Sequence, residues 1–181
     1  MDDFNKFNDL NNIEFKGFVF DLGNNKLLEE FINNEKKNSL WVIGKHSSGS
    51  LIASWQNDGT SNKLENPIVW IDSEGSPICV IADNYLQFLS ILPYGIVLFY
   101  DIVSTWESIK SNKERFSEFS EKFNLSYCKS LLAENDNFNK DSITKIDKII
   151  NENKISIETN PFTKIIKAIE NNTDFEAWLF S

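Results

Sequence analysis

The chain has 181 residues, which is the size of one domain or of one domain with an appendage. Its 41% hydrophobic and 13% aromatic content supports a hydrophobic core and excludes an intrinsically disordered protein. The formal net charge of −9 disfavours binding to nucleic acid or to an anionic membrane surface and favours a basic partner, although solubility alone also explains such a charge.

The N-terminal residues and the longest apolar run both favour a cytoplasmic protein. Residues 1–5 contain neither the basic nor the apolar part of a secretory signal. The longest apolar run, residues 94–100, is too short to span a bilayer. Only Cys79 and Cys128 are present, so we expect small core side chains and no disulfide framework.

The first 40 residues are expected to hold one strand and one helix. Residues 1–14 form a polar lead that we expect to be frayed. The apolar residues 15–22 predict a strand. Leucine and aromatic side chains then recur at helical spacing, which predicts an amphipathic helix over residues 25–37.

Four β-rich segments follow, separated by short stretches of turn-forming residues. Connections this short require antiparallel pairing, because a parallel pair needs a long crossover. The segment between the last two strands contains Gly75, which we expect to supply a positive φ. The predicted strands are residues 40–44, 51–55, 67–71 and 77–82, with a loop at residues 57–62.

The rest of the chain has helical periodicity. Asp83 is expected to cap a helix over residues 85–92 that ends at Pro93. Asn160 and Asp174 are expected to cap two later helices. Apolar stripes at helical spacing comprise Phe116, Phe119 and Phe123, then Ile143, Ile146, Ile149 and Ile150, then Phe162, Ile165, Ile166 and Ile169, and finally Phe175, Trp178 and Leu179.

These elements predict an α+β protein with a bent antiparallel sheet of four to six strands, helices packed on it, and a helical C-terminal region. We divide the chain into a lead (residues 1–14), an α+β core (residues 15–100) and a C-terminal extension packed on the core (residues 101–181).

Catalytic and metal-binding patterns are weak. His46 is the only histidine, which excludes a multi-histidine metal site and favours a surface turn histidine over a catalytic one. Asp72 and Glu74 could act as an acid–base pair or bind a divalent ion, but two acids around a Ser-Glu-Gly turn are more often turn chemistry. We therefore expect no enzyme activity, no metal and no cofactor.

Residues 66–92 carry an ordered set of short motifs. The set is a strand with Pro67-Ile68-Val69-Trp70, a Ser73-Glu74-Gly75 turn, a strand ending Val80-Ile81-Ala82-Asp83-Asn84, and a helix with Phe88-Leu89 and Leu92. It resembles the SUKH superfamily, which joins fungal cell-wall-synthesis regulators to many bacterial immunity proteins. The resemblance covers about residues 15–100 and implies helices on a strongly bent sheet. Two features depart from the family: the helical lead is short, and the region after Tyr100 is long.

The resemblance implies a protein that acts by binding another protein. Our leading hypothesis is an immunity protein that neutralises a cognate toxin with a basic surface, such as a nuclease. The alternatives are a non-catalytic regulatory scaffold of the fungal type and a small hydrolase using Asp72 and Glu74. Ordinary solvated surface also explains the acids, and Trp106 is equally compatible with the core. The candidate contact residues are Asp58, Asp72, Glu74, Asp101, Trp106 and Glu107.

Overall fold

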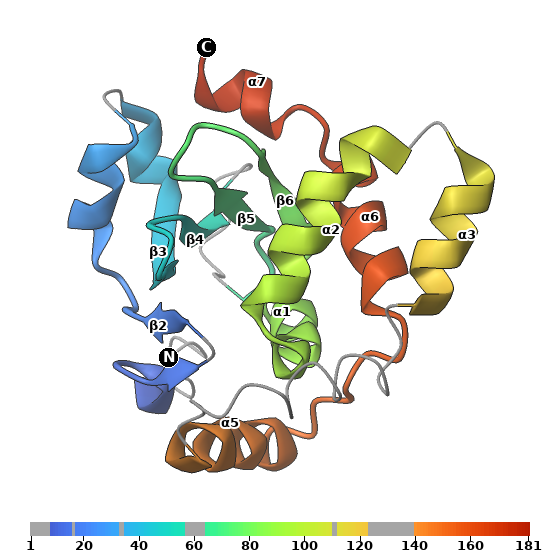
Figure 1. Cartoon of the computed structure of the whole chain (residues 1–181). Coiled ribbons are helices and arrows are strands. Elements are labelled where there is room, and N and C mark those ends of the chain that lie inside the picture. The colour runs from blue at the N-terminus through green and yellow to red at the C-terminus, as the bar shows by residue number, and fades with distance from the viewer. Residues whose placement is uncertain (1–7, 16, 33–34, 57–63, 110–111, 123–139) are drawn as a thin grey trace.

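The computed structural model describes residues 8–15, 17–32, 35–56, 64–109, 112–122 and 140–181 (Figure 1). Within them, six strands form one open antiparallel sheet in chain order, so that each strand pairs with the next. This confirms the α+β class and the antiparallel pairing. The strands are β1 (Glu14–Phe15), β2 (Phe18–Phe20), β3 (Leu40–His46), β4 (Leu51–Trp55), β5 (Ile68–Ile71) and β6 (Ile78–Ala82).

Two predictions for the first 40 residues are wrong in detail. The single strand over residues 15–22 is a tight hairpin of β1 and β2, with Gly17 near the turn at a φ of 78°. The helix expected over residues 25–37 is replaced by two 3-10 helices, η2 (Asn25–Glu30) and η3 (Glu35–Ser39). At the start of η2 the Asn25 side chain bonds the β3 backbone, accepting from Val42 N and donating to Leu40 O. This segment is therefore tied to the sheet through its amide side chain.

The lead is packed where the structure describes it. The side chains of Leu10 and Ile13 are 0% and 5% exposed. The Asn12 amide donates to Phe20 O at 2.8 Å, which joins the lead to β2. Residues 8–14 are thus anchored rather than frayed, because Leu10 and Ile13 pack into the core while their polar neighbours stay exposed; residues 1–7 lie outside the described part.

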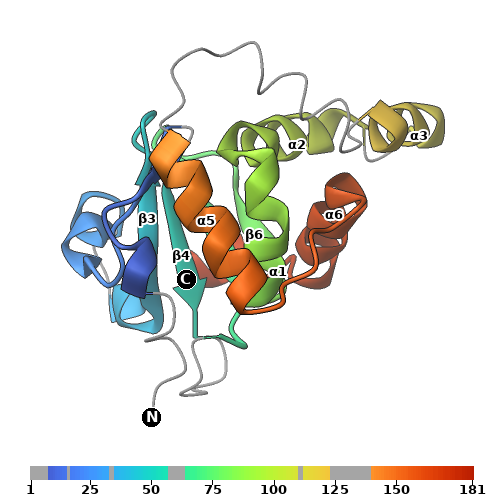
Figure 2. The same cartoon turned by 90° about the horizontal axis from the view of Figure 1, so that it is seen from below.

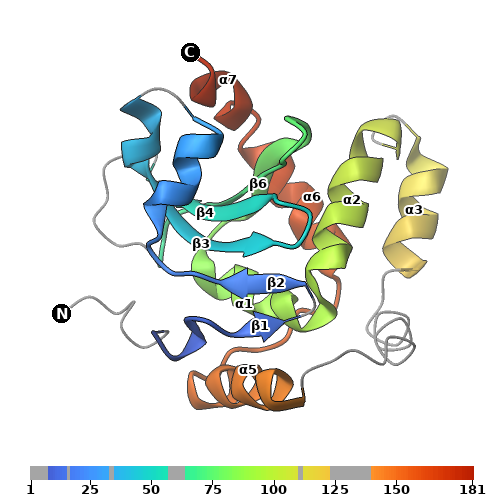
Figure 3. The ribbon, with the colours of Figure 1, turned by 60° about the vertical axis from the view of Figure 1, so that its left-hand side comes forward.

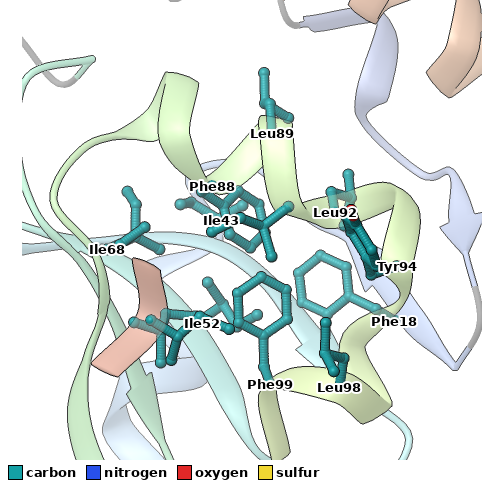
Figure 4. Packing of buried hydrophobic residues seen from close by; sticks show 14 of the residues in the cluster. Phe18, Ile43, Ile52, Ile68, Phe88, Leu89, Leu92, Tyr94, Leu98 and Phe99 are labelled. Carbon is teal, nitrogen blue, oxygen red and sulfur yellow. The ribbon is translucent and has the colours of Figure 1, made fainter. Parts of the chain in front are cut away.

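Both faces of the sheet are buried along β4 and β5. Alternate residues of β5 point to opposite sides, Ile68 and Trp70 into one cluster and Val69 and Ile71 into the other. The first cluster is covered by helices, and Figure 4 shows Phe88 and Phe99 packing near Ile52. Those helices are α1 (Tyr85–Ile91), α2 (Ile96–Ile109), α5 (Lys140–Glu152) and α6 (Pro161–Asn171).

The second cluster is closed by different elements. Leu28 of η2 and Phe175 and Leu179 of α7 (Phe175–Leu179) pack on this face. Phe175 and Trp178 also lie against the Trp55 ring at the end of β4. The sheet is therefore the middle of three layers around β4 to β6, which explains why these strands are nearly continuous apolar runs instead of alternating ones.

Helices also lie at both margins of the sheet. α5 packs beside β1, the first strand, and α6 packs against β6, the last (Figures 2 and 3). Short 3-10 helix η4 (Leu92–Tyr94) separates α1 from α2, and α3 (Lys113–Lys122) contacts α2 and α6. The C-terminal helices thus flank the strands that would otherwise expose unpaired backbone.

The boundary that we expected between residues 100 and 101 falls inside α2. Phe99 and Ile102 both belong to the first cluster, so the described residues on either side share one core. Asn160 caps α6 as expected, accepting from Thr163 N at 3.0 Å. The cap of α1 is Asn84 rather than Asp83, because Asn84 Oδ1 accepts from Gln87 N.

Cap chemistry at the last helix differs from the expectation. Asp174 stands at the N-cap position of α7, but its side chain makes no capping hydrogen bond. Cys79 lies on β6 and is partly buried, whereas Cys128 is outside the described residues. In the part of the chain that the structure describes, no helix has both the length and the apolar character needed to cross a membrane.

Candidate functional site

The connection between β5 and β6, residues 72–77, holds the most organised polar structure among the described residues. The backbone turns back on itself where Gly75 N donates to Asp72 O at 3.1 Å. Gly75 has a φ of 89°, which confirms the positive value expected from the sequence. One side of this connection faces the β3–β4 turn, and the other side lines a groove.

Asp72 anchors the first side. The residue is 6% exposed, and its carboxylate accepts three hydrogen bonds. Ser50 Oγ and Trp70 Nε1 donate to Oδ2 at 3.0 and 3.3 Å, and the Glu74 amide donates to Oδ1 at 2.9 Å. A buried carboxylate is stable only when its oxygens are bonded in this way. Asp72 therefore holds two turns together.

The network continues from Ser50 to the only histidine. Ser48 Oγ lies 3.0 Å from Ser50 Oγ and 2.8 Å from His46 Nδ1, and the Ser48 amide also donates to that nitrogen. In a catalytic triad the imidazole stands between the serine and the carboxylate. Here the order is histidine, serine, serine, carboxylate, which is the geometry of linked turns. Burial lowers the pKa of His46, while the nearby Asp72 charge acts in the opposite direction.

On the other side of the connection lies a groove with a volume of about 520 Å³, which we name the α6–α7 groove. It is bounded by the start of β6, the second half of α2, the end of α6 and the start of α7. The lining residues are Ser76, Pro77, Ile78, Cys79, Val103, Trp106, Ile169, Glu170, Asn172, Thr173 and Glu176.

The chemistry of the α6–α7 groove is divided. Apolar side chains from β6, α2 and α6 line it, whereas exposed glutamates stand on α6 and α7. None of the lining residues is a lysine, arginine or histidine, and two are acidic, Glu170 and Glu176. A cationic group therefore meets only attractive charge from the groove lining.

Cys79 lines the groove, and its surroundings determine the protonation state of its thiol. Burial raises the pKa of its thiol, and the negative charge of Glu176 raises it further. The thiol is accordingly neutral at physiological pH, which is the opposite of the thiolate that a nucleophilic cysteine requires. Glu176 lines the groove together with Cys79.

The structure distributes the six predicted contact residues over several places. Asp72 is buried within the turn network, and Glu74, two residues later, is exposed. Asp101 lies half-buried on α2. Trp106, 9% exposed, belongs to the first core cluster and also lines the groove. Asp58 is outside the described residues, as is the side chain of Glu107 on α2.

Sequence reasoning missed the glutamates of the groove. Glu170 and Glu176 stand on either side of the Asn-Asn-Thr-Asp segment that joins α6 to α7. The signal in the sequence was the absence of any basic residue between Lys167 and the end of the chain. Without the fold, that absence does not show which apolar surface the two acids adjoin.

No protein-family model, curated protein or solved structure gave a match to this chain. The resemblance to the SUKH superfamily remains a prediction that depends on residues 66–92. Within the described ranges, no three histidine, cysteine, aspartate or glutamate side chains are grouped closely enough to hold a metal ion.

Proposed function

We propose that this chain is an immunity-type protein that binds and neutralises a protein toxin with a basic surface. The observation that carries the proposal is the α6–α7 groove, which combines an apolar wall with two exposed glutamates and is lined by Ser76 and Pro77, the residues that follow the exposed turn at Glu74. Trp106 is the aromatic residue in the groove lining. Aromatic side chains in partner-binding pockets are typical of the positions that dominate binding energy.

Charge complementarity supports a toxin that acts on nucleic acid. A nuclease must hold phosphate groups with lysine or arginine side chains. An inhibitor with a net charge of −9 can present carboxylates to the same side chains. Opposite charge also accelerates the encounter between the two proteins, which matters when the toxin must be intercepted before it acts.

The rigidity of the turn network supports the same role. Asp72 and Ser50 fix the β5–β6 connection to the β3–β4 turn, so the start of β6 is held in place before any partner arrives. A surface that is already in its bound shape loses less conformational entropy on association. High affinity then requires fewer contacts.

The direct test begins with the gene immediately upstream in the source genome. If it encodes a large secreted protein ending in a compact basic domain, that domain is purified and titrated against this chain by calorimetry. We expect a dissociation constant of about 1 nM or lower, weakening as salt is raised, and loss of the toxic activity at equimolar ratio.

Two results would overturn the proposal. Absence of binding to such a domain at micromolar concentration is the first. The second is a gene neighbourhood without a toxin together with micromolar binding to a housekeeping protein, which would favour the regulatory scaffold. As a control, the titration is repeated in high salt, where a contact between acidic and basic surfaces must weaken.

A further inference from the structure

The α6–α7 groove combines an apolar wall with an acidic edge, and a long cationic side chain has the matching shape. We propose that one arginine of the partner inserts into this groove, its methylene stem along the apolar wall and its guanidinium beside Glu170 and Glu176. The inference rests on the proposed function in one respect, namely that the partner is a basic protein.

The apolar wall suits the stem of the arginine. Pro77, Ile78, Val103 and Ile169 line the groove and give the methylene groups a surface on which to exclude water. Trp106 stands among them, and its ring is held by Phe116 in an edge-to-face arrangement with centroids 6.3 Å apart. A fixed indole favours a guanidinium, which stacks on aromatic rings more readily than an ammonium does.

The acidic edge suits the guanidinium. Glu170 lies in the last turn of α6 and Glu176 in the first turn of α7, and both side chains are exposed. Glu170 and Glu176 both line the groove together with Cys79 of the apolar wall. A planar guanidinium presents several N–H donors, and hydrogen bonds from these donors to carboxylates are charge-assisted and stronger than neutral ones.

The end of α6 adds to the attraction. The C-terminus of a helix carries a partial negative charge that a cation stabilises. The last turn of α6 contains no basic side chain, and Asn172 caps the carbonyls of Ala168 and Ile169 with its own N–H groups. An incoming arginine therefore supplies the positive charge that the helix end lacks.

The first experiment uses a small probe and the full chain. N-acetyl-arginine methylamide is titrated against isotope-labelled protein and followed by NMR. We expect chemical-shift changes at the Trp106 indole N–H and at the amides of Thr173 and Glu176. The lysine derivative should bind several-fold more weakly, and the uncharged norleucine derivative should produce no saturable shift at these positions.

A matched pair of variants decides whether the carboxylates are responsible. Glu170→Gln/Glu176→Gln should weaken the arginine probe by about tenfold. Asp9→Asn/Glu14→Gln is the control, because it also removes two negative charges but does so near β1, at the opposite margin of the sheet from β6. It should leave the probe's affinity unchanged. Both variants change only exposed side chains, and a dispersed NMR spectrum verifies that each one is folded.

Several outcomes would overturn the inference. These are equal binding of the norleucine derivative, full affinity in Glu170→Gln/Glu176→Gln, or equal losses in the two double variants. Shifts that spread over the surface without involving Trp106 would overturn it as well, because they would indicate general charge attraction.

The same variants separate this inference from the proposed function once a toxin domain is in hand. If the wild type and Glu170→Gln/Glu176→Gln bind the toxin with equal affinity, the proposed function is supported. The same result would refute the groove as the site that accepts an arginine of the toxin. Wild-type protein that fails to bind the toxin would refute the proposed function, and the arginine titration would still decide the chemistry of the groove. A loss of about tenfold or more in toxin affinity, absent from the control variant, supports both.

Discussion

The two sides of the β5–β6 connection use the same functional group in opposite ways. On one side the Asp72 carboxylate is buried and accepts three hydrogen bonds from its own chain. On the other side Glu170 and Glu176 keep their carboxylates at the surface beside an apolar wall. Burial, and not residue type, therefore decides whether an acidic side chain stabilises the fold or remains accessible to a partner.

The physical reason is desolvation. Removing a carboxylate from water costs several kcal/mol unless hydrogen bonds replace the lost hydration. Asp72 satisfies that requirement with Ser50, Trp70 and the Glu74 amide, so its carboxylate is engaged by hydrogen bonds within the protein. Glu170 and Glu176 remain hydrated, and their charge becomes useful only when a cation displaces that water.

Removing the inner carboxylate should have the largest effect on stability. In Asp72→Ala, the Ser50 hydroxyl, the Trp70 indole and the Glu74 amide lose their acceptor inside the protein. We expect the free energy of unfolding to fall by about 3 kcal/mol, measured by urea denaturation. The matched control is Glu74→Ala, an exposed position two residues away, which should cost less than about 0.5 kcal/mol. Equal losses in the two variants would contradict the structural role of Asp72.

The turn between the two sides should show a smaller loss. Gly75 has a φ of 89°, and a methyl group added there would meet no atom within 4 Å. The cost of Gly75→Ala is thus conformational, and we expect about 1 kcal/mol in urea denaturation. Gly44→Ala is the contrasting control, because its methyl carbon would lie 2.3 Å from Val19 O and should cost more. A reversed order would contradict these backbone assignments.

His46 should make the inner network sensitive to mild acid. In the folded protein, burial lowers the pKa of His46 below its value of about 6.5 in the unfolded chain. The unfolded chain therefore takes up the proton first, so this contribution to stability is complete above pH 6.5 and is lost as the pH falls toward the folded pKa. The decline in unfolding free energy between pH 7 and 5 should be shallower in His46→Gln than in the wild type.

NMR titration of the imidazole in the folded protein provides the direct measurement for that prediction. A pKa above 6.5 would mean that attraction by Asp72 outweighs the burial of the ring, and the pH dependence would then have the opposite sign.

The groove carboxylates should have the smallest effect on stability. Both are exposed, so Glu170→Gln/Glu176→Gln should change the free energy of unfolding by less than about 0.5 kcal/mol in either direction. The measurement is urea denaturation beside Asp72→Ala under the same conditions. A loss as large as that of Asp72→Ala would show that these glutamates also stabilise the fold, and would remove the contrast between the two regions.

The predicted elements succeeded where the signal is local. The β3–β4 hairpin, the third and fourth predicted strands, the positive φ of Gly75 and the Asn160 cap each depend on a few neighbouring residues. The failures in the first 40 residues share a cause, which is competition from a distant element. Asn25 bonds the β3 backbone at the start of a segment that forms a 3-10 helix, and Leu10 and Ile13 pack into the core that the lead was expected to leave.

The sequence by itself determined the α+β class, the antiparallel order of neighbouring strands and the acidic character of the chain, because these follow from periodicity, short connections and composition. Only the tertiary structure decided that Asp72 is buried, that Trp106 lines a groove, and that residues 76–79 lie beside residues 169–176. Those segments are about ninety residues apart, and packing of α6 against β6 brings them together. Burial and cavities arise from such long-range packing, which no local pattern encodes.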